Sequence, residues 1–424
     1  MHDSSVISAS DAIFEQKSTL SGEIRSQIAP IASYHGTHSR RGKSLRAKGV
    51  RNMLVGVPKE IKVHEYRVGL TPEAVREFVA AGNHVIVETG AGAGINATDA
   101  AYEAAGAKIV PNADEVFAKA EMVVKVKEPQ PSEWIKLREN QILFTYLHLA
   151  PDPEQAKGLL ASGVTAVAYE TVVGPDGVSL PLLAPMSEVA GRLAVEAAGS
   201  ALQRHSGGRG MLLGGVPGVL PAKVLVLGGG VVGTHAARMA AGVGAEVTIL
   251  DRSLPRLRQL DELFQGRAKT RFASTTAIEE EVQTADVVIG AVLVPGASAP
   301  KLVTKAMLKT MKQGAVMVDV AIDQGGCFET SHATTHAAPT YIVDGIVHYC
   351  VANMPGAVPY TSSHALNNAT LPYGLALAAG GIKGIVKHPG LLSGLNIHRG
   401  QLTHPAVAES LKLELKPAVA ALAA

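Results

Sequence analysis

Cysteine is nearly absent from this sequence: Cys327 and Cys350 are the only two among 424 residues. They form neither a C-x-x-C pair nor a cluster with metal-ligand spacing. This excludes a disulfide scaffold and is typical of a protein from a reducing compartment. We therefore expect no metal site.

Aromatic residues are also scarce, at 4%, beside a hydrophobic fraction of 47% and a charged fraction of 18%. Alanine, valine, leucine and glycine must therefore fill the cores, as is common in α/β folds whose parallel sheets are buried on both faces. With 424 residues, the chain has room for two or three domains.

Long apolar runs and a strong charge of one sign are missing as well. No stretch approaches the roughly 20 consecutive apolar residues of a membrane span, so we expect no membrane partner. The formal net charge of +2 gives no reason to expect nucleic acid as a partner.

What the sequence does contain is a glycine-centred stretch at residues 223–251, KVLVLGGGVVGTHAARMAAGVGAEVTILD. Its apolar, β-branched run Val224–Leu227 predicts a strand. A helix is predicted over His235–Val243, and a second strand over Glu246–Leu250 ends on Asp251. Strand, glycine turn, helix and strand in this order are typical of a unit that binds a dinucleotide.

The three glycines of this stretch, Gly228, Gly230 and Gly233, have the spacing G-x-G-x-x-G. The first permits a tight turn, the second lets the backbone approach a pyrophosphate, and the third lets the helix pack closely on the sheet. The helix N-terminus offers free N–H groups to the phosphates. Asp251 can accept hydrogen bonds from the adenosine ribose, so we predict that NAD is the cofactor.

Residues 1–52 differ from the rest, because they are rich in serine, lack a sustained apolar period and end in a basic stretch. One interpretation is an organellar targeting peptide; another is a disordered extension or an upstream start codon. Targeting peptides are poor in acidic residues, whereas Asp3, Asp11, Glu15 and Glu23 occur here. We favour the second interpretation and expect a cytoplasmic protein.

From Met53 onward, strands alternate with helices, which predicts parallel, doubly wound sheets. Thr71 caps a predicted helix that begins at Pro72 and stops at Gly82. The predicted strands of this part are Leu54–Val57, His84–Glu88, Met122–Val126, Ile142–Leu147 and Thr165–Tyr169.

Two polar residues follow directly on predicted strands: Lys127 and His148. In such sheets the ligand lies beyond the carboxyl ends of the strands. Asp323 similarly follows a predicted strand of the glycine-centred half, Ala315–Val320. The pattern predicts two Rossmann-like domains, of which the NAD-binding one, 184–359, is inserted in a discontinuous substrate domain, 53–183 and 360–424. The tail from Tyr360 onward is predicted to be mostly helical.

Each candidate group also has an ordinary structural explanation. Arg67 could be a surface charge beside Glu65, and Lys127 a solvated strand end. His148 could be a core histidine and Asp323 a helix cap. Their common position at the mouths of two sheets, one of which binds a nicotinamide cofactor, favours the functional interpretation.

A series of motifs from Met53 to about Leu411 resembles the NAD-dependent alanine dehydrogenases, which are related to the NAD-binding part of proton-translocating transhydrogenase. The motifs are GVPKEIKVHEYRVGLTP, VKVKEP, LFTYLHLA, LLAPMSEVAGR, GGRGMLLGGVPGV, VLGGGVVGTHAARMA, VIGAVLVPGA, DVAIDQGGCFE and YCVANMPGAVP. The resemblance implies a homohexamer that converts L-alanine to pyruvate and ammonium.

The resemblance also implies roles for individual residues. Arg67, Lys127 and Asn353 would bind the substrate, and His148 and Asp323 would be the acid–base pair. The implied cofactor contacts beyond the glycine turn and Asp251 are Ser187, Val292, Leu293, Asp323, Asn353 and Met354.

The chemistry of these side chains agrees with the implied roles. A guanidinium can hold a substrate carboxylate with two hydrogen bonds, and histidine titrates near neutral pH. Two alternatives stay open: a soluble, NAD(H)-binding transhydrogenase-like subunit, and a non-catalytic NAD sensor on the same fold.

Overall fold

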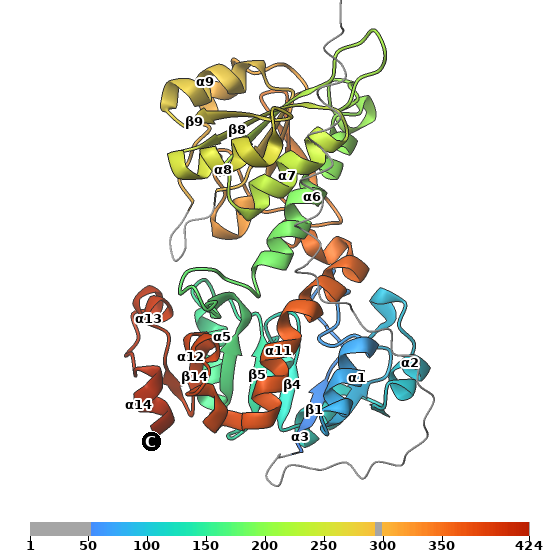
Figure 1. The fold of residues 1–424 in the computed structure, drawn as a ribbon, viewed down its shortest axis with the longest axis vertical. Helices are drawn as coiled ribbons and strands as arrows, with labels where there is room; N and C mark the ends of the chain where they lie inside the picture. The colour runs from blue at the N-terminus through green and yellow to red at the C-terminus, as the bar shows by residue number, and fades with distance from the viewer. Residues whose placement is uncertain (1–51, 293–298, 424) are drawn as a thin grey trace, which may run out of the picture. The chain divides into compact units, whose positions relative to one another are not determined.

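The computed structural model describes residues 52–292 and 299–423, which form two α/β sheets flanked by helices (Figure 1). The first sheet has the order β15-β14-β6-β5-β4-β1-β2-β3. Strands β1 to β6 pair in parallel, whereas β14 is antiparallel to β6 and to β15. Its strands are β1 Leu54–Val57, β2 His84–Glu88, β3 Lys108–Val110, β4 Met122–Val124, β5 Ile142–Thr145, β6 Thr165–Ala168, β14 Leu395–His398 and β15 Gln401–Leu402.

The second sheet has the order β12-β13-β11-β10-β7-β8-β9. All neighbours pair in parallel except β12, which is antiparallel to β13. Its strands are β7 Lys223–Leu227, β8 Glu246–Asp251, β9 Lys269–Phe272, β10 Val287–Gly290, β11 Val316–Asp319, β12 Thr340–Val343 and β13 Ile346–Tyr349. The expected fold class, two doubly wound Rossmann-like sheets, is confirmed.

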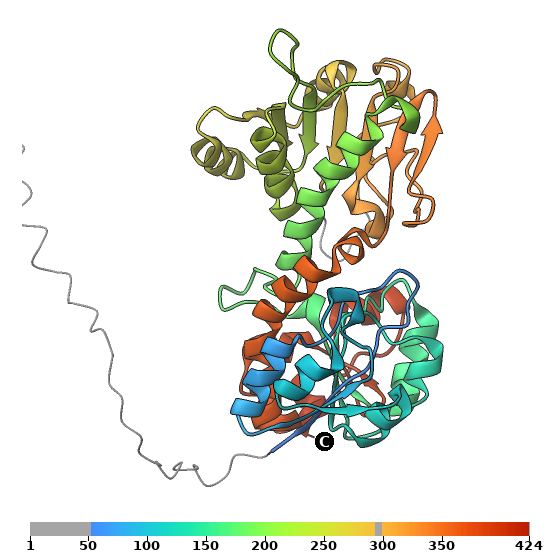
Figure 2. The ribbon, with the colours of Figure 1, turned by 90° about the vertical axis from the view of Figure 1, so that its right-hand side faces the viewer.

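Helices connect the parallel strands of both sheets (Figure 2). The α-helices are α1 Pro72–Ala80, α2 Asp99–Ala104, α3 Ala113–Lys119, α4 Pro131–Trp134, α5 Pro153–Ser162, α6 Ala184–Ala201, α7 Val231–Gly242, α8 Leu254–Phe264, α9 Thr275–Thr284, α10 Lys305–Leu308, α11 Pro359–Ile385, α12 Pro389–Gly394, α13 Pro405–Leu411 and α14 Ala418–Ala423. The 3-10 helices are η2 Ala93–Ile95, η3 Tyr169–Thr171, η4 Arg204–Ser206, η5 Val320–Gln324 and η6 Met354–Ala357.

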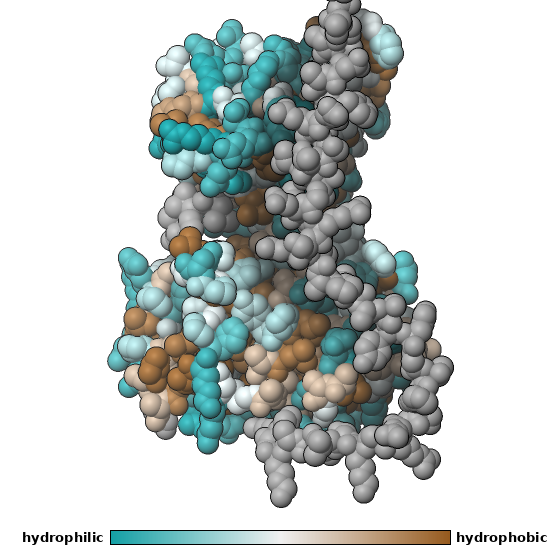
Figure 3. Space-filling view, in the orientation of Figure 1, coloured by the Kyte–Doolittle hydropathy of each residue, from teal (hydrophilic) through white to brown (hydrophobic). Residues whose placement is uncertain are grey.

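The central strands of each sheet are buried on both faces, which explains why they are apolar at successive positions. In β5, Phe144 packs into the core on one face and Leu143 into the core on the other. In β7, Val224 likewise packs into the core on one face and Leu225 into the core on the other. On the outer surface in Figure 3, hydrophilic side chains predominate over α8 and α9, and apolar ones gather near α11 and α14.

Helix α1 begins as its residues predict. The Thr71 side chain accepts a hydrogen bond from the Ala74 N–H, and Pro72 is the first helical residue. Helix α7, in contrast, begins at Val231 and not at the predicted His235, because Gly230 is its N-cap and the apolar residues that follow are already helical. The glycine turn is therefore followed directly by the helix.

The tail is mostly helical, as predicted, but it also contains two strands that were not predicted. After α11, which is interrupted at Gly381 by non-helical backbone angles, strands β14 and β15 extend the first sheet. They were missed because β14 is four residues long and β15 two, too short for a periodic pattern. The boundaries 53–183, 184–359 and 360–424 remain a prediction.

Several strands end earlier than predicted. The last residue of β4 is Val124 and that of β5 is Thr145, so Lys127 and His148 each lie three residues beyond a strand. Strand β6 likewise ends at Ala168, and β11 at Asp319. Since parallel strands end at the same edge, the two polar side chains follow neighbouring strands at one edge of the first sheet.

Candidate active site

The glycine turn between β7 and α7 has the sterics that its spacing predicts. Gly228 has a φ of +98°, which a residue with a side chain rarely adopts. A Cβ atom on Gly233 would lie 1.8 Å from the Gly228 carbonyl oxygen, so helix and turn touch at this point. A Cβ atom on Gly230 would meet nothing within 4 Å. The middle glycine thus opens onto free space at the start of α7.

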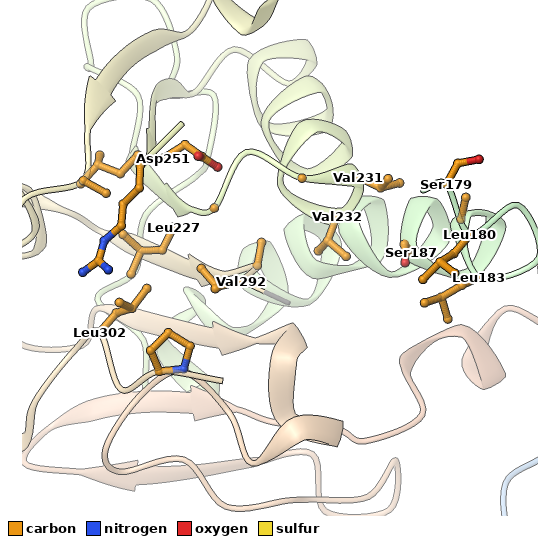
Figure 4. Close-up of a pocket in the computed structure, with 18 of the residues that line it drawn as sticks. Ser179, Leu180, Leu183, Ser187, Leu227, Val231, Val232, Asp251, Val292 and Leu302 are labelled. Carbon is orange, nitrogen blue, oxygen red and sulfur yellow. The ribbon is translucent and has the colours of Figure 1, made fainter. Parts of the chain in front are cut away.

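That space belongs to a cavity of about 600 Å³ (Figure 4), within the size range of small-molecule sites. Asp251 lies at one end of the side chains drawn in Figure 4, and Ser187 with Ser179 at the other. Among the predicted cofactor residues, those that line the cavity are Ser187, Gly228, Gly230, Asp251 and Val292. Leu293 lies outside the described residues.

Asp251 ends β8 and is tied to the glycine turn. Its Oδ2 atom accepts a hydrogen bond of 2.7 Å from the Gly229 N–H, and its Oδ1 one of 2.8 Å from Ser253. A carboxylate oxygen can accept more than one hydrogen bond, so Asp251 can also accept from a ribose hydroxyl. No side chain caps the first turn of α7. The pocket therefore fits a dinucleotide, with anions at the helix and a hydroxyl-bearing group at Asp251.

Arg256 is a neighbour of the glycine turn that the sequence analysis missed. Its Nε donates to the Gly229 carbonyl at 2.7 Å, and its Nη2 to the Thr234 hydroxyl at 2.8 Å. It lies on the first turn of α8, and an arginine on a helix surface is usually a solvated charge. Nothing in the sequence therefore distinguishes it from other surface arginines. These two hydrogen bonds stabilise the glycine turn from the side of α8.

Arg67 is not a surface charge but a buried one, 2% exposed. Glu65 holds it through two hydrogen bonds, from Nε at 2.7 Å and from Nη2 at 2.6 Å. Nη1 donates to the Met186 sulfur at 3.0 Å. Burial alone would raise the pKa of Glu65, but its bonds and attraction to Arg67 lower it to about 2. Glu65 was absent from the predicted site, since only the fold shows it buried.

Asn353 completes this cluster from the far end of the sequence. Its side-chain oxygen accepts from Arg67 Nη2, and its amide donates to Glu65 Oε2, both at 3.0 Å. Met354, the next residue, is 2% exposed and packs in the core of the second sheet. Neither residue is among those that line the cavity of Figure 4.

Lys127 lies in a second cluster of charges, half-buried beyond β4. Its Nζ is 3.9 Å from Glu128 Oε2, and Lys62 pairs with the other oxygen of that carboxylate. Burial raises the pKa of Glu128, but the two lysines outweigh it and hold this pKa below its ordinary value. Lys125, two residues earlier, is instead buried in an ion pair with Glu60 and Glu133 beneath the loop.

Asp323, in η5 after β11, belongs to the same cluster. It is exposed on its solvent side, yet protein atoms crowd the carboxyl group, and this desolvation raises its pKa above the ordinary value. Lys127, His148 and Lys62 oppose the rise. The structure therefore places Asp323 within the electrostatic influence of Lys127 and His148. A carboxyl group with a raised pKa is suited to proton transfer closer to neutral pH.

The His148 ring stacks on Tyr146, with ring centroids 5.6 Å apart and planes 8° from parallel. Burial raises the pKa of Tyr146, and the charge of Arg67 opposes this rise. Tyr146 is thus adjacent to the candidate base on one side and close to the Arg67 cluster on the other.

Two negative findings apply to residues 52–292 and 299–423. No three histidine, cysteine, aspartate or glutamate side chains converge as a set of metal ligands. No helix in these ranges has the length and apolarity to cross a membrane.

Family models match both halves of this architecture. "Alanine dehydrogenase/PNT, N-terminal domain" matches residues 56–190, and "Alanine dehydrogenase/PNT, C-terminal domain" matches residues 194–405. The chain belongs to the alanine dehydrogenase/PNT family.

Individual members of the family are similar along nearly their whole length. The alanine dehydrogenase of Halomonas elongata is 59% identical over 363 residues, which cover 85% of this chain and 98% of that protein. That of Bacillus subtilis is 54% identical over 372 residues, 87% of this chain and 98% of the relative.

Solved structures of the family are similar too. An L-alanine dehydrogenase has a TM-score of 0.82 and 53% identity, covering 85% of this chain and 99% of the other. A transhydrogenase from Sinorhizobium meliloti has a TM-score of 0.70 and 26% identity, covering 83% and 99%.

Proposed function

We propose that this chain catalyses the reversible oxidative deamination of L-alanine to pyruvate and ammonium with NAD. The observation that carries the proposal is the position of Lys127 and His148 beyond the ends of the neighbouring strands β4 and β5, where both act on the pKa of Asp323. It is supported by relatives at 53–59% identity that are named alanine dehydrogenase.

Each residue of the two clusters has a task in this reaction. NAD, when bound, takes up the hydride from the substrate Cα. Lys127 and Arg67 hold the substrate oxygens by charge. His148 takes a proton from the water that attacks the imino carbon, and the carboxyl group of Asp323 assists by accepting or returning protons. Asn353, through its bonds to Glu65 and Arg67, keeps the guanidinium in place.

The dinucleotide is held by the cavity of the second sheet. The N–H groups at the start of α7 beside Gly230 would hold the pyrophosphate, and Asp251 would accept from the adenosine ribose. Ser187 and Val292 also line this cavity and would contact the dinucleotide, and the resemblance implies the same role for Leu293. Met354 supports this region from the core.

A panel of amino acids with NAD and NADP at alkaline pH tests the activity. We expect reduction of NAD with L-alanine, and much slower reduction with larger amino acids. No alanine-dependent reduction would reject the proposal. It would leave the two alternatives, the NAD(H)-binding transhydrogenase-like subunit and the non-catalytic NAD sensor.

The preference for NAD rests on Asp251. A carboxylate at the end of β8 repels the 2′-phosphate of NADP, and this repulsion in a partly enclosed site favours NAD by roughly two decades or more. Arg252, which also lines the cavity, would favour NADP if it turned inward. Asp251→Ser should gain activity with NADP and lose part of the affinity for NAD. Equal efficiency of the unmodified protein with both cofactors would remove this role from Asp251.

We further propose a cytoplasmic homohexamer. Light scattering during size exclusion should give six times the mass of one chain, and any other multiple contradicts this assembly. Import of the full-length protein into an isolated organelle would favour the targeting interpretation of residues 1–52 instead.

A further inference from the structure

The backbone of His148 has an unusual conformation for a residue with a side chain. Its φ is +48°, in the left-handed region, where the Cβ atom of an L-residue crowds the following carbonyl. A conformation of this kind persists only where surrounding groups hold it. Groups that contact the loop after β5 must therefore hold the backbone of His148 in this conformation.

Two side chains bind the peptide bond that precedes His148. The N–H group of this peptide, which belongs to His148, donates to Glu170 Oε1 at 2.7 Å. The carbonyl group of the same peptide, which belongs to Leu147, accepts a hydrogen bond of 2.9 Å from Gln155 Nε2. The Leu147 N–H adds bonds of 3.2 Å to both Glu170 oxygens. The plane of this peptide is thus fixed at both ends.

The two side chains come from different elements of the first sheet. Glu170 lies in η3 at the end of β6, which pairs in parallel with β5 up to Thr145 and Ala168. Gln155 lies in α5 and is fully buried. Bonds from backbone N–H groups to a carboxylate are charge-assisted and about twice as strong as neutral ones. The conformation is therefore imposed by the fold and not by the loop itself.

The imidazole ring is held as well as its backbone. It stacks on Tyr146, whose hydroxyl donates to the Leu182 carbonyl at 2.5 Å. The peptide plane before His148 and one face of its ring are therefore both fixed. As a result, the ring nitrogens can point in only a narrow range of directions. A catalytic base needs this restriction, because displacement by about 1 Å costs roughly a hundredfold in rate.

We infer that Glu170 and Gln155 are positioning residues that clamp the Leu147–His148 peptide and so aim the His148 imidazole at the substrate. The inference rests on the proposed function for the role of His148. Neither residue is assigned a contact with substrate or cofactor. Their effect passes through the backbone of His148.

The experiment compares Glu170→Gln, Glu170→Ala and Gln155→Leu with a matched control, Asp99→Asn. Asp99 is also a carboxylate that accepts a backbone N–H, from Gly90 at 2.9 Å, but it is the first residue of α2 and far from the loop after β5 in the sequence. We expect kcat to fall roughly 10- to 100-fold in Glu170→Ala. Glu170→Gln should fall less, because its amide oxygen still accepts one N–H. Gln155→Leu should also lose turnover, and Asp99→Asn should not.

Four readouts separate positioning from a general loss of structure. The dissociation constant of NADH should stay within about twofold in all variants, while the pH profile of kcat changes in the clamp variants only. In a His148→Gly background, Glu170→Ala should lower Tm less than in the unmodified protein, because glycine adopts the left-handed conformation without strain. Crystal structures should show the φ of residue 148 leaving the left-handed region in Glu170→Gln.

Wild-type kcat and pH profiles in both Glu170→Gln and Gln155→Leu would overturn the inference, even if Glu170→Ala does not fold. An unchanged φ at residue 148 in Glu170→Gln would overturn it as well. If the unmodified protein does not oxidise L-alanine, the proposed function fails, and the crystallographic φ still decides whether the clamp exists.

Discussion

At the scale of single residues, the polar groups at the ends of the strands divide into candidates for the chemistry and residues that hold other side chains in place. Among the candidates, Lys127 and His148 act electrostatically on Asp323. Glu65 and Asn353, in contrast, form hydrogen bonds that hold Arg67 in place. The two kinds of residue should respond differently to substitution, the first in turnover and the second in stability as well.

His148→Ala should lower turnover by roughly two to four decades, the usual contribution of a positioned acid–base group. The affinity for NADH should stay nearly unchanged, because His148 is not among the residues that line the cavity. Steady-state kinetics and a fluorescence titration with NADH check both parts. His84→Ala, at an exposed position, is the control. Near-normal turnover in His148→Ala would contradict the assignment.

Glu65 should contribute stability that depends on pH. Its pKa of about 2 in the folded protein lies below the ordinary 4.5, so the contribution is present above the unfolded pKa and is lost as the pH falls towards 2. A shift of this size corresponds to about 3 kcal/mol. Glu65→Gln should be strongly destabilised at neutral pH, because Arg67 is left buried without its partner.

The measurement is the difference in the free energy of unfolding between the unmodified protein and Glu65→Gln as a function of pH. This difference should shrink between roughly pH 5 and pH 2. Glu77→Gln, an exposed position on α1, should show no such trend. A difference that stays constant across this range would show that the Glu65 carboxylate is not stabilised by Arg67.

At the scale of elements, the unit β7–turn–α7 can be tested with three glycines. Gly233→Ala should disrupt the packing of α7, because its Cβ would lie 1.8 Å from the Gly228 carbonyl oxygen. Gly230→Ala should keep the Tm but weaken NADH binding, because its methyl group enters the space in front of the helix. Thermal unfolding and NADH titration measure the two effects.

The control for this pair is Gly242→Ala, at the last residue of α7, where a Cβ also meets nothing within 4 Å. It should leave NADH binding unchanged and stabilise the helix by up to about 1 kcal/mol. Wild-type affinity for NADH in Gly230→Ala would mean that the pyrophosphate does not lie against this turn.

At the scale of the whole molecule, the prediction concerns residues 1–52. The family models match from residue 56 onward, and the segment has too little apolar content to join a core. A chain that begins at Met53 should therefore have the same Tm and kcat/KM as the full chain. A drop in Tm by several degrees on truncation would show that the segment packs on the folded part.

The features that could be predicted from the sequence are those with local causes. The glycine spacing specifies the turn before α7 because sterics act between residues a few positions apart. Apolar runs predict buried strands, and a polar residue directly after such a run predicts a position at the sheet edge. Lys127, His148 and Asp323 are predicted as site residues in this way. The start of α7 was misplaced by four residues, because the N-cap is a glycine without a capping side chain.

The rest was decided by contacts between residues far apart in the chain. Asn353 meets Glu65 across 288 positions, and β14 pairs with β6 in the first sheet. Nothing near Glu170 in the sequence indicates that its carboxylate holds the backbone of His148. Hydrogen bonds of this kind leave no periodic pattern, because their partners meet only after the strands have paired. The sequence by itself determined which side chains reach the strand ends, and the tertiary structure decided which of them are held in place and by what.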